Sequence, residues 1–145
     1  MADELAPPTL FFAPFVSSTM GVEPAWLDYN GHLNMAYYHV LFDRAVDEAF
    51  ELVGLGPDYL REANCSYFVA EIHTLYKREV SATDTVRVTL QLIDHDEKRL
   101  HFYQRCATPR RAGWRPRART CPSTSIWLPG RCRPSRPEST TTLRS

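Results

Sequence analysis

A short polar loop just before a long amphipathic segment contains three side chains that could take part in chemistry, those of Asp28, His32 and Asn34. Gly31 lies in the same loop. A carboxylate such as that of Asp28 can act as a nucleophile or as a general base toward water. The first N–H groups of a helix have no partners inside the helix, and they can stabilise an oxyanion. The spacing predicts an acid opposite a helix start. A carboxylate that merely caps the loop or the helix explains the same pattern equally well.

The neighbours of Asp28 each have a structural and a chemical interpretation. Gly31 permits a turn with positive φ or the close approach of a ligand, and the plain turn is the commoner case. His32 could shuttle a proton or orient a carboxylate, although a lone loop histidine is more often a structural hydrogen-bonding group. Asn34 is predicted first of all to cap the helix, and Asn30 is the other residue that could do so.

Aromatic residues flank this loop and could shape a binding pocket. Trp26, Tyr37 and Tyr38 could line an acyl pocket, or form a cage around a cationic acyl group. Packing in the core is the commoner role for aromatic side chains at a helix start. Glu71, on the polar side of a predicted strand, could face a cleft at a subunit interface or simply face solvent.

One long helix should follow the loop and end before Pro57. Its apolar residues recur with the i, i+3, i+4, i+7 spacing of a helix that packs on a core, namely Tyr38, Leu41, Phe42, Ala45, Ala49, Leu52 and Val53. Gly54 can take the left-handed conformation that ends a helix, and Pro57 cannot continue one. The segment Pro57 to Ala63 could add one more helical turn.

Strands are predicted on both sides of this helix. Residues 15–22 form a first candidate. Apolar and polar residues alternate over 67–80 as in a half-buried strand, and the even-numbered residues, among them Phe68 and Ile72, are predicted to face inward. Val86, Val88, Leu90 and Leu92 alternate with polar residues, a tight hairpin follows at 94–97, and a return strand begins at Arg99. This order predicts an α+β fold in which an antiparallel sheet wraps one helix.

Length and composition indicate one domain. The 145 residues are 43% hydrophobic and 12% aromatic, which suffices for one modest core. No apolar run approaches the roughly 20 residues of a membrane span, and the N-terminal residues do not resemble a signal peptide. We therefore expect a cytoplasmic protein with no membrane partner. The four cysteines have no zinc-binding spacing, so we expect reduced thiols and no metal.

The zero net charge hides two different kinds of sequence. Residues 1–104 carry seven Lys and Arg against sixteen Asp and Glu, whereas 105–145 carry ten Arg and a single acid. We divide the chain into an N-terminal arm at 1–14, a folded domain at 15–105 and an Arg-, Pro- and Ser-rich tail at 106–145. Because the tail has no sustained periodicity, we expect it to be irregular. It could be a disordered basic tail, or the product of a shifted reading frame in a GC-rich gene.

The stretch VEPAWLDYNGHLNMAYYHVLFDRAVD resembles the signature of hotdog-fold acyl-CoA thioesterases of the 4-hydroxybenzoyl-CoA thioesterase type. In that family an aromatic residue and an Asp precede Gly-His-x-Asn and the long central helix. The resemblance continues through FVAEIHTLYKREVSATDTVRVTLQLIDHDEKRLHFYQ, and so covers about residues 15 to 104. The segments DYNGHLNMAYY, LYKREV and HDEKRLH are most similar to the betainyl-CoA thioesterase branch.

The resemblance implies a homodimer or homotetramer that binds acyl-CoA between subunits. No cofactor is implied beyond the coenzyme A of the substrate. Asp28 would be the catalytic carboxylate, and the backbone amide near Met35 would polarise the thioester carbonyl. The implied catalytic group is Asp28, His32 and Asn34; the implied substrate-binding group is Gly31, Met35, Tyr37, Tyr38, Trp26 and Glu71. Family members complete the sheet with further strands. The sequence after Gln104 lacks a well-formed strand pattern, so we expect an atypical C-terminal segment.

Two alternatives to a thioesterase remain open. Asp28-Tyr29-Asn30-x-His32 resembles the Asp-x-Asn-Pro-x-His motif of hotdog enoyl-CoA hydratases and dehydratases, but it lacks the Pro and its His comes one residue early. The other alternative is a non-catalytic or degenerate hotdog protein with a basic tail. Ten arginines could bind phosphate backbones through charge alone. Since no aromatic-lined groove accompanies them, no nucleic-acid partner is expected.

Overall fold

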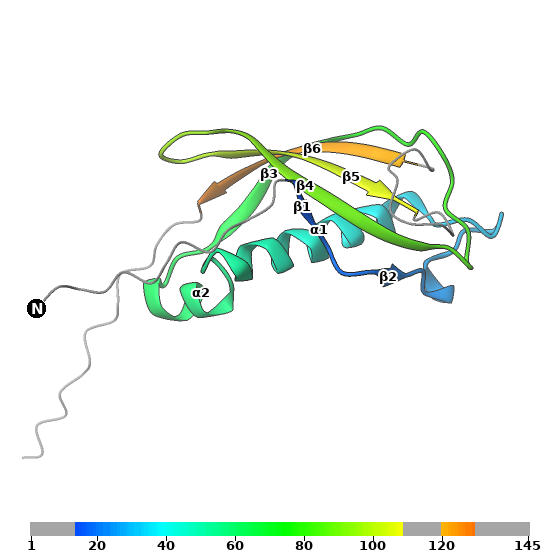
Figure 1. Cartoon of the computed structure of the whole chain (residues 1–145), viewed down its shortest axis with the longest axis horizontal. Coiled ribbons are helices and arrows are strands. Elements are labelled where there is room, and N and C mark those ends of the chain that lie inside the picture. The colour runs from blue at the N-terminus through cyan, green and yellow to red at the C-terminus, as the bar shows by residue number, and fades with distance from the viewer. Residues whose placement is uncertain (1–13, 109–119, 130–145) are drawn as a thin grey trace, which may run out of the picture.

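The computed structural model describes residues 14–108 and 120–129 (Figure 1). The elements in chain order are β1 (Phe15–Val16), β2 (Met20–Gly21), the short 3-10 helix η1 (Pro24–Trp26), α1 (Met35–Leu52), α2 (Pro57–Ala63), β3 (Tyr67–Thr74), β4 (Thr85–His95), β5 (Leu100–Ala107) and β6 (Thr120–Pro129). The predicted arm, apart from residue 14, lies outside the described residues.

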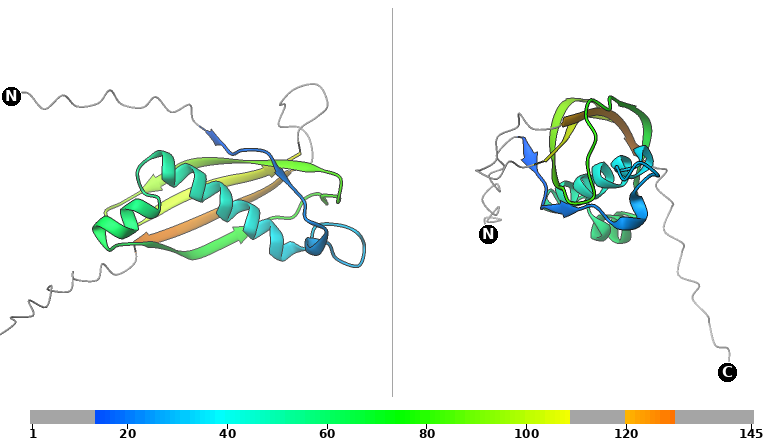
Figure 2. Two further views of the ribbon diagram at one scale, coloured as in Figure 1. Left: turned by 90° about the horizontal axis from the view of Figure 1, so that it is seen from below. Right: turned by 90° about the vertical axis from the view of Figure 1, so that its right-hand side faces the viewer.

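The strands form one antiparallel sheet that curves over α1, as Figure 2 shows. Its order is β1-β4-β5-β6-β3, and β2 also pairs with β4. Side chains from α1, β4 and β5, among them Leu41, Val88 and Phe102, pack between the helix and the sheet. The predicted α+β fold with a sheet wrapped around one helix is confirmed.

Helix α1 begins and ends at the predicted signals. The Asn34 side chain accepts a hydrogen bond from the Ala36 N–H at 3.0 Å, so Asn34 rather than Asn30 is the cap. Gly54, just beyond the helix, has φ +75°. The buried face comprises Tyr38, Leu41, Phe42, Ala45, Val46, Ala49 and Phe50. Leu52 and Val53 were predicted to extend that face, but they are exposed, and Val46 and Phe50 complete the buried face in their place.

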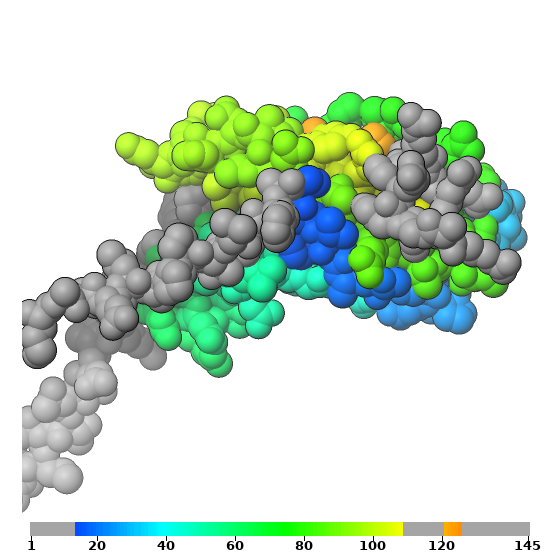
Figure 3. Space-filling model, in the orientation of Figure 1, coloured from blue at the N-terminus to red at the C-terminus, as the bar shows by residue number. Residues whose placement is uncertain are grey.

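The predicted strand at 15–22 is two short strands. Phe15 pairs with Leu90, and Met20 pairs with Val86 further along β4. Between them the buried Ser17 hydroxyl accepts a hydrogen bond from the Val88 N–H at 2.9 Å, so a side chain replaces part of the backbone ladder. Figure 3 shows the blue N-terminal residues on the surface beside the green residues of β4.

The prediction for residues 67–80 is wrong in length and in orientation. Strand β3 ends at Thr74, and Phe68 and Ile72 are 51% and 41% exposed. Tyr67 and Val69 pack against the core in their place. The register of β3 against β6 shifts between Val69 and Glu71, so a simple alternation does not hold along this strand.

The β4–β5 hairpin follows the prediction closely. Val86, Val88 and Leu90 are buried, and the Asp96 N–H bonds the Arg99 carbonyl at the turn. Leu92 was also expected inside but is 45% exposed. A register shift between Leu92 and Asp94 ends the alternation there.

Strand β6 lies in the segment that was predicted to be irregular, and β5 extends into that segment as far as Ala107, so the prediction is wrong for residues 106–107 and 120–129. The strand pairs with β5 on one side and β3 on the other. Among residues 121–125, the part of β6 whose side chains are described, the buried side chains are the small ones of Cys121, Ser123 and Ser125. The other residues of the predicted tail beyond Thr108 lie outside the described part of the chain, and the shifted reading frame stays a prediction.

Two buried thiols face each other across β5 and β6. Cys106 and Cys121 are free and directly paired in register, as expected of reduced thiols. Burial raises the pKa of Cys106 to about 12, and the neighbouring Cys121 adds to the effect. Cys65 is disulfide-bonded, so the prediction of a reduced thiol is wrong at that position.

Candidate active site

A cleft of about 700 Å³ opens at the N-terminal end of α1. One wall is the loop before α1 and its first turn, and the other is the segment that follows β3. The two walls are joined by a hydrogen bond from the Leu33 N–H to the Val80 carbonyl at 2.8 Å and by a bridge between His32 and Ser81. The cleft is lined by Asp28, His32, Leu33, Met35, Tyr38, Tyr76, Lys77, Arg78, Glu79 and Ser81.

The Asp28 carboxylate is fixed by its own loop. Its Oδ1 accepts hydrogen bonds from the Asn30 N–H at 2.8 Å and the His32 N–H at 3.2 Å. Gly31, with φ +78°, makes the tight turn that brings these amides round, and its N–H donates to the Asp28 carbonyl. Within the described residues no group donates to Oδ2, so that oxygen can accept a proton or attack a substrate.

The first turn of α1 supplies the complementary group. Met35 is the first helical residue and lines the same cleft as Asp28. Among the described residues none accepts a hydrogen bond from the Met35 N–H, as is usual at a helix start. Asn34 caps the helix and is not part of the cleft lining. The arrangement presents a carboxylate and the positive end of the helix dipole to one space.

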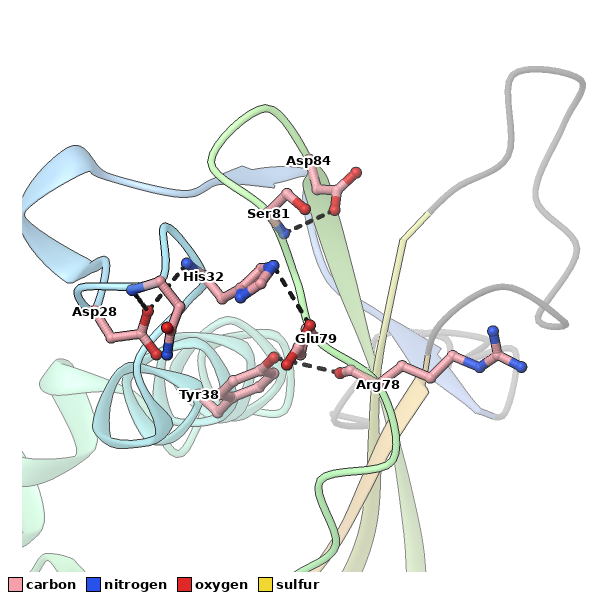
Figure 4. Close-up of polar contacts among 8 residues, drawn as sticks. Asp28, His32, Tyr38, Arg78, Glu79, Ser81 and Asp84 are labelled. Carbon is pink, nitrogen blue, oxygen red and sulfur yellow. Dashed lines mark hydrogen bonds and ion pairs between the residues drawn. The ribbon is translucent and has the colours of Figure 1, made fainter.

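His32 connects the loop to the opposite wall. Its ring Nε2 lies 3.4 Å from the Glu79 carboxylate, while its backbone N–H bonds Asp28 (Figure 4). The ring points toward Glu79 and not toward the Asp28 carboxylate. His32 therefore orients a carboxylate, as one interpretation of the sequence proposed, but the ring partner is Glu79.

Of the three predicted aromatic residues only Tyr38 reaches the cleft. Its hydroxyl donates to the Arg78 carbonyl at 3.5 Å, and burial, with smaller effects from Cys121 and Cys106, raises the pKa of Tyr38 above its usual range. Trp26 and Tyr37 stack on each other at 5.4 Å within the core, and the Arg44 guanidinium lies 4.9 Å from the Trp26 ring. These contacts occupy both rings, so neither lines the cleft.

Six residues of the cleft lining were not identified from the sequence, and Tyr76 and Glu79 are two of them. The Tyr76 hydroxyl lies 3.4 Å from the Met35 carbonyl and 3.2 Å from His39 Nε2, and its ring meets Tyr38 edge-on at 5.3 Å. Burial raises the pKa of Tyr76, and Cys121 adds to it. No local pattern signals either residue, because only the pairing of the two walls brings them to the loop. Glu71 is exposed on β3 and does not line the cleft.

The described residues contain no group of three or more His, Cys, Asp or Glu side chains placed to hold a metal ion. No helix in the same part of the chain is long and apolar enough to cross a membrane.

We compared the sequence with models of known protein families in order to assign the fold and the cleft to a class of protein. Residues 22–120 match the model of the thioesterase-like superfamily, and the chain belongs to that family. Its antiparallel sheet around a central helix is the hotdog fold of these proteins.

Individual relatives place the chain within the superfamily. It is similar to the betainyl-CoA thioesterase of Pseudomonas aeruginosa, with 38% identity over 88 residues, which is 61% of this chain and 55% of the relative. The chain thus spans about half the length of that relative. A candidate thioesterase of Pseudomonas putida KT2440 has a similar structure, with 32% identity, a TM-score of 0.66 and coverage of 81% of this chain and 73% of the other.

A third comparison concerns the fold alone. A Staphylococcus aureus protein solved in complex with CoA superposes with a TM-score of 0.71 at 24% identity, over 85% of this chain and 73% of that one.

Proposed function

We propose that this protein hydrolyses a small acyl-CoA to the free acid and coenzyme A. The observation that carries the proposal is that the Asp28 carboxylate and the start of α1 line one cleft. Membership of the thioesterase-like superfamily and the similarity to betainyl-CoA thioesterases support it. No cofactor is needed beyond the CoA of the substrate.

The thioester carbonyl oxygen would lie at the Met35 N–H, where the helix start stabilises the negative charge of a tetrahedral intermediate. Asp28 Oδ2 would act in one of two ways. As a general base it removes a proton from water, whose oxygen forms the new bond to the acyl carbon. As a nucleophile it forms an acyl anhydride that water then hydrolyses. In both cases the C–S bond breaks and the sulfur leaves as the CoA thiolate.

Other residues of the loop and the cleft would position the reacting groups or bind the substrate. Gly31 allows the turn that aims the Asn30 and His32 amides at Asp28 Oδ1, and these hydrogen bonds fix the direction of the carboxylate. Asn34 fixes the first turn of α1 and therefore the direction of the Met35 N–H. Lys77, a cation of the cleft lining, would meet the phosphates of CoA.

We further propose that a second copy of the chain completes the cleft, in a homodimer or homotetramer. Within the described residues β3 pairs on one side only, and it exposes Phe68 and Ile72 beside Leu75. An unpaired edge with exposed apolar side chains is a surface that association would bury. Sedimentation equilibrium would measure the mass in solution, and a monomer at micromolar concentration would contradict the proposal. A cytoplasmic location stays a prediction.

The decisive test of the activity is Asp28→Asn, assayed by release of free thiol from a panel of acyl-CoA thioesters that includes betainyl-CoA. We expect a loss of at least about a hundredfold in kcat, because removal of a general base or nucleophile has effects of this size. Asp43→Asn, on the exposed face of α1, is the matched control and should keep the parent rate.

An Asp28→Asn variant as active as the parent would exclude the proposed role. Loss of enoyl absorbance by the parent without release of thiol would instead support the hydratase alternative.

A further inference from the structure

Glu79 is the carboxylate of the cleft that the proposed chemistry does not use. It lies on the wall opposite the Asp28 loop, and the His32 ring at 3.4 Å holds it there. The segment that carries it is fixed on both sides. The Leu33 N–H bonds the Val80 carbonyl, and Tyr38 bonds the Arg78 carbonyl. The Glu79 side chain is 73% exposed, and it lines the same cleft as Asp28 and Met35.

The cleft lining carries charges of both signs, with Lys77 and Arg78 next to Glu79 in the chain. The Arg78 side chain points away from His32 and Glu79 (Figure 4). A carboxylate at this place repels the phosphates of CoA. The Glu79 end of the cleft therefore suits the acyl group rather than the nucleotide.

An aromatic side chain lines the same cleft as this carboxylate. Tyr76 lines the same cleft, its hydroxyl contacts the Met35 carbonyl and His39, and its ring makes a T-shaped contact with the ring of Tyr38. A tyrosine ring fixed in this way can attract a cation through its face. An aromatic ring and a carboxylate together form a site for an organic cation.

The start of α1 affects how a cationic acyl group can bind. The positive end of the helix dipole would repel an acyl group that carries a positive charge. In an acyl group with a quaternary nitrogen on the α carbon, that nitrogen lies about 2.5 Å from the carbonyl carbon. The cation must therefore sit close to the helix start, and a nearby negative charge is needed to offset the repulsion.

We propose that Glu79, held by His32, and the ring of Tyr76 select acyl groups that bear a quaternary ammonium beside the thioester carbonyl. This inference rests on the proposed thioesterase activity and makes Glu79 and Tyr76 specificity-determining residues. His32 is a positioning residue, which acts through Glu79.

The test compares two substrates of the same shape that differ only in charge. They are betainyl-CoA and 3,3-dimethylbutanoyl-CoA, in which carbon replaces the quaternary nitrogen. The measured quantity is the ratio of their kcat/KM values by thiol release. We expect the parent to prefer the cation by about tenfold or more. Partial unfolding of a variant affects both substrates alike, so it does not change the ratio.

Glu79→Gln keeps the shape of the side chain and removes its charge, so we expect the ratio to fall by about tenfold. Glu97→Gln, at the exposed hairpin turn, is the matched control and should keep the parent ratio. Tyr76→Leu should lower the ratio, whereas Tyr76→Phe, which retains the ring, should lower it less. His32→Gln, which removes the ring beside Glu79, should also lower it.

The outcomes separate this inference from the thioesterase proposal. If the parent hydrolyses the neutral substrate as well as the cationic one, the selectivity is wrong and the thioesterase stands. If the parent prefers the cation but Glu79→Gln keeps the full ratio, the assignment to Glu79 is wrong. If neither substrate releases thiol at any enzyme concentration, the proposed activity fails, and the inference fails with it.

Discussion

At the scale of single residues, the cleft depends on carboxylates that the backbone holds in different ways. Asp28 is fixed by two amides of its own loop, and Glu79 is fixed by a side chain from that loop. His32 takes part in both, through its backbone N–H and through its ring. One loop of a few residues therefore places both acids, which explains why its sequence is so dense in polar groups.

Below the cleft, the buried Cys106 gives a prediction about stability against pH. Its folded pKa is raised to about 12, against 9.0 for the free group. The unfolded thiol loses its proton above pH 9 while the folded one keeps it, so the free energy of unfolding falls as pH rises from 9 toward 12. We expect Cys106→Ala to weaken this fall by up to about 1.4 kcal/mol per pH unit.

Urea denaturation of the parent and Cys106→Ala at pH 7.5, 9 and 10 measures the effect. The difference in unfolding free energy between the two proteins at pH 7.5 reports packing alone, because the thiol is neutral in both states there. The parent should lose its advantage as the pH rises. A difference that is constant over the three pH values would contradict the assignment.

At the scale of elements, α1 both organises the core and points its first turn at the site. The Asn34 cap holds that turn, so Asn34→Ala should lower the free energy of unfolding by about 1 kcal/mol. Asn30→Ala, in the exposed part of the same loop, is the control, since Asn30 uses its backbone and not its side chain to bind Asp28. Thermal and urea denaturation of both variants would measure the difference. Equal losses in the two variants would show that the cap contributes nothing.

Elements with a strong local pattern were predictable, and the others were not. The apolar residues of α1 recur at helical spacing, and apolar and polar residues alternate along β4. Each pattern is explained by burial of one face of the element, so each can be recognised from the sequence. The inward side of β3 depends on its register with β6, which no local pattern states. The Asp28 loop was identified because its groups are adjacent in sequence. Glu79 and Tyr76 join it through the pairing of Leu33 with Val80 and of His32 with Ser81.

At the scale of the whole molecule, β6 decides whether the sheet is continuous. It lies between β5 and β3, so its loss would free one edge of each and uncover the buried Cys106. The Arg and Pro content of the surrounding sequence conceals the small side chains that alternate into the core at Cys121, Ser123 and Ser125. The strand joins β5 to β3 through backbone pairing on both of its sides.

This role predicts opposite results for two truncations of the C-terminal segment, both compared in reducing buffer. A chain that ends after residue 129 keeps β6, and it should unfold cooperatively. A chain that ends after residue 119 lacks β6 and loses the backbone pairing on both sides of it. Since a domain of this size is stable by only about 5–15 kcal/mol, we expect the shorter chain to show no cooperative transition. Circular dichroism on heating would distinguish them, and cooperative unfolding of the shorter chain would show that residues 120–129 are not part of the native sheet.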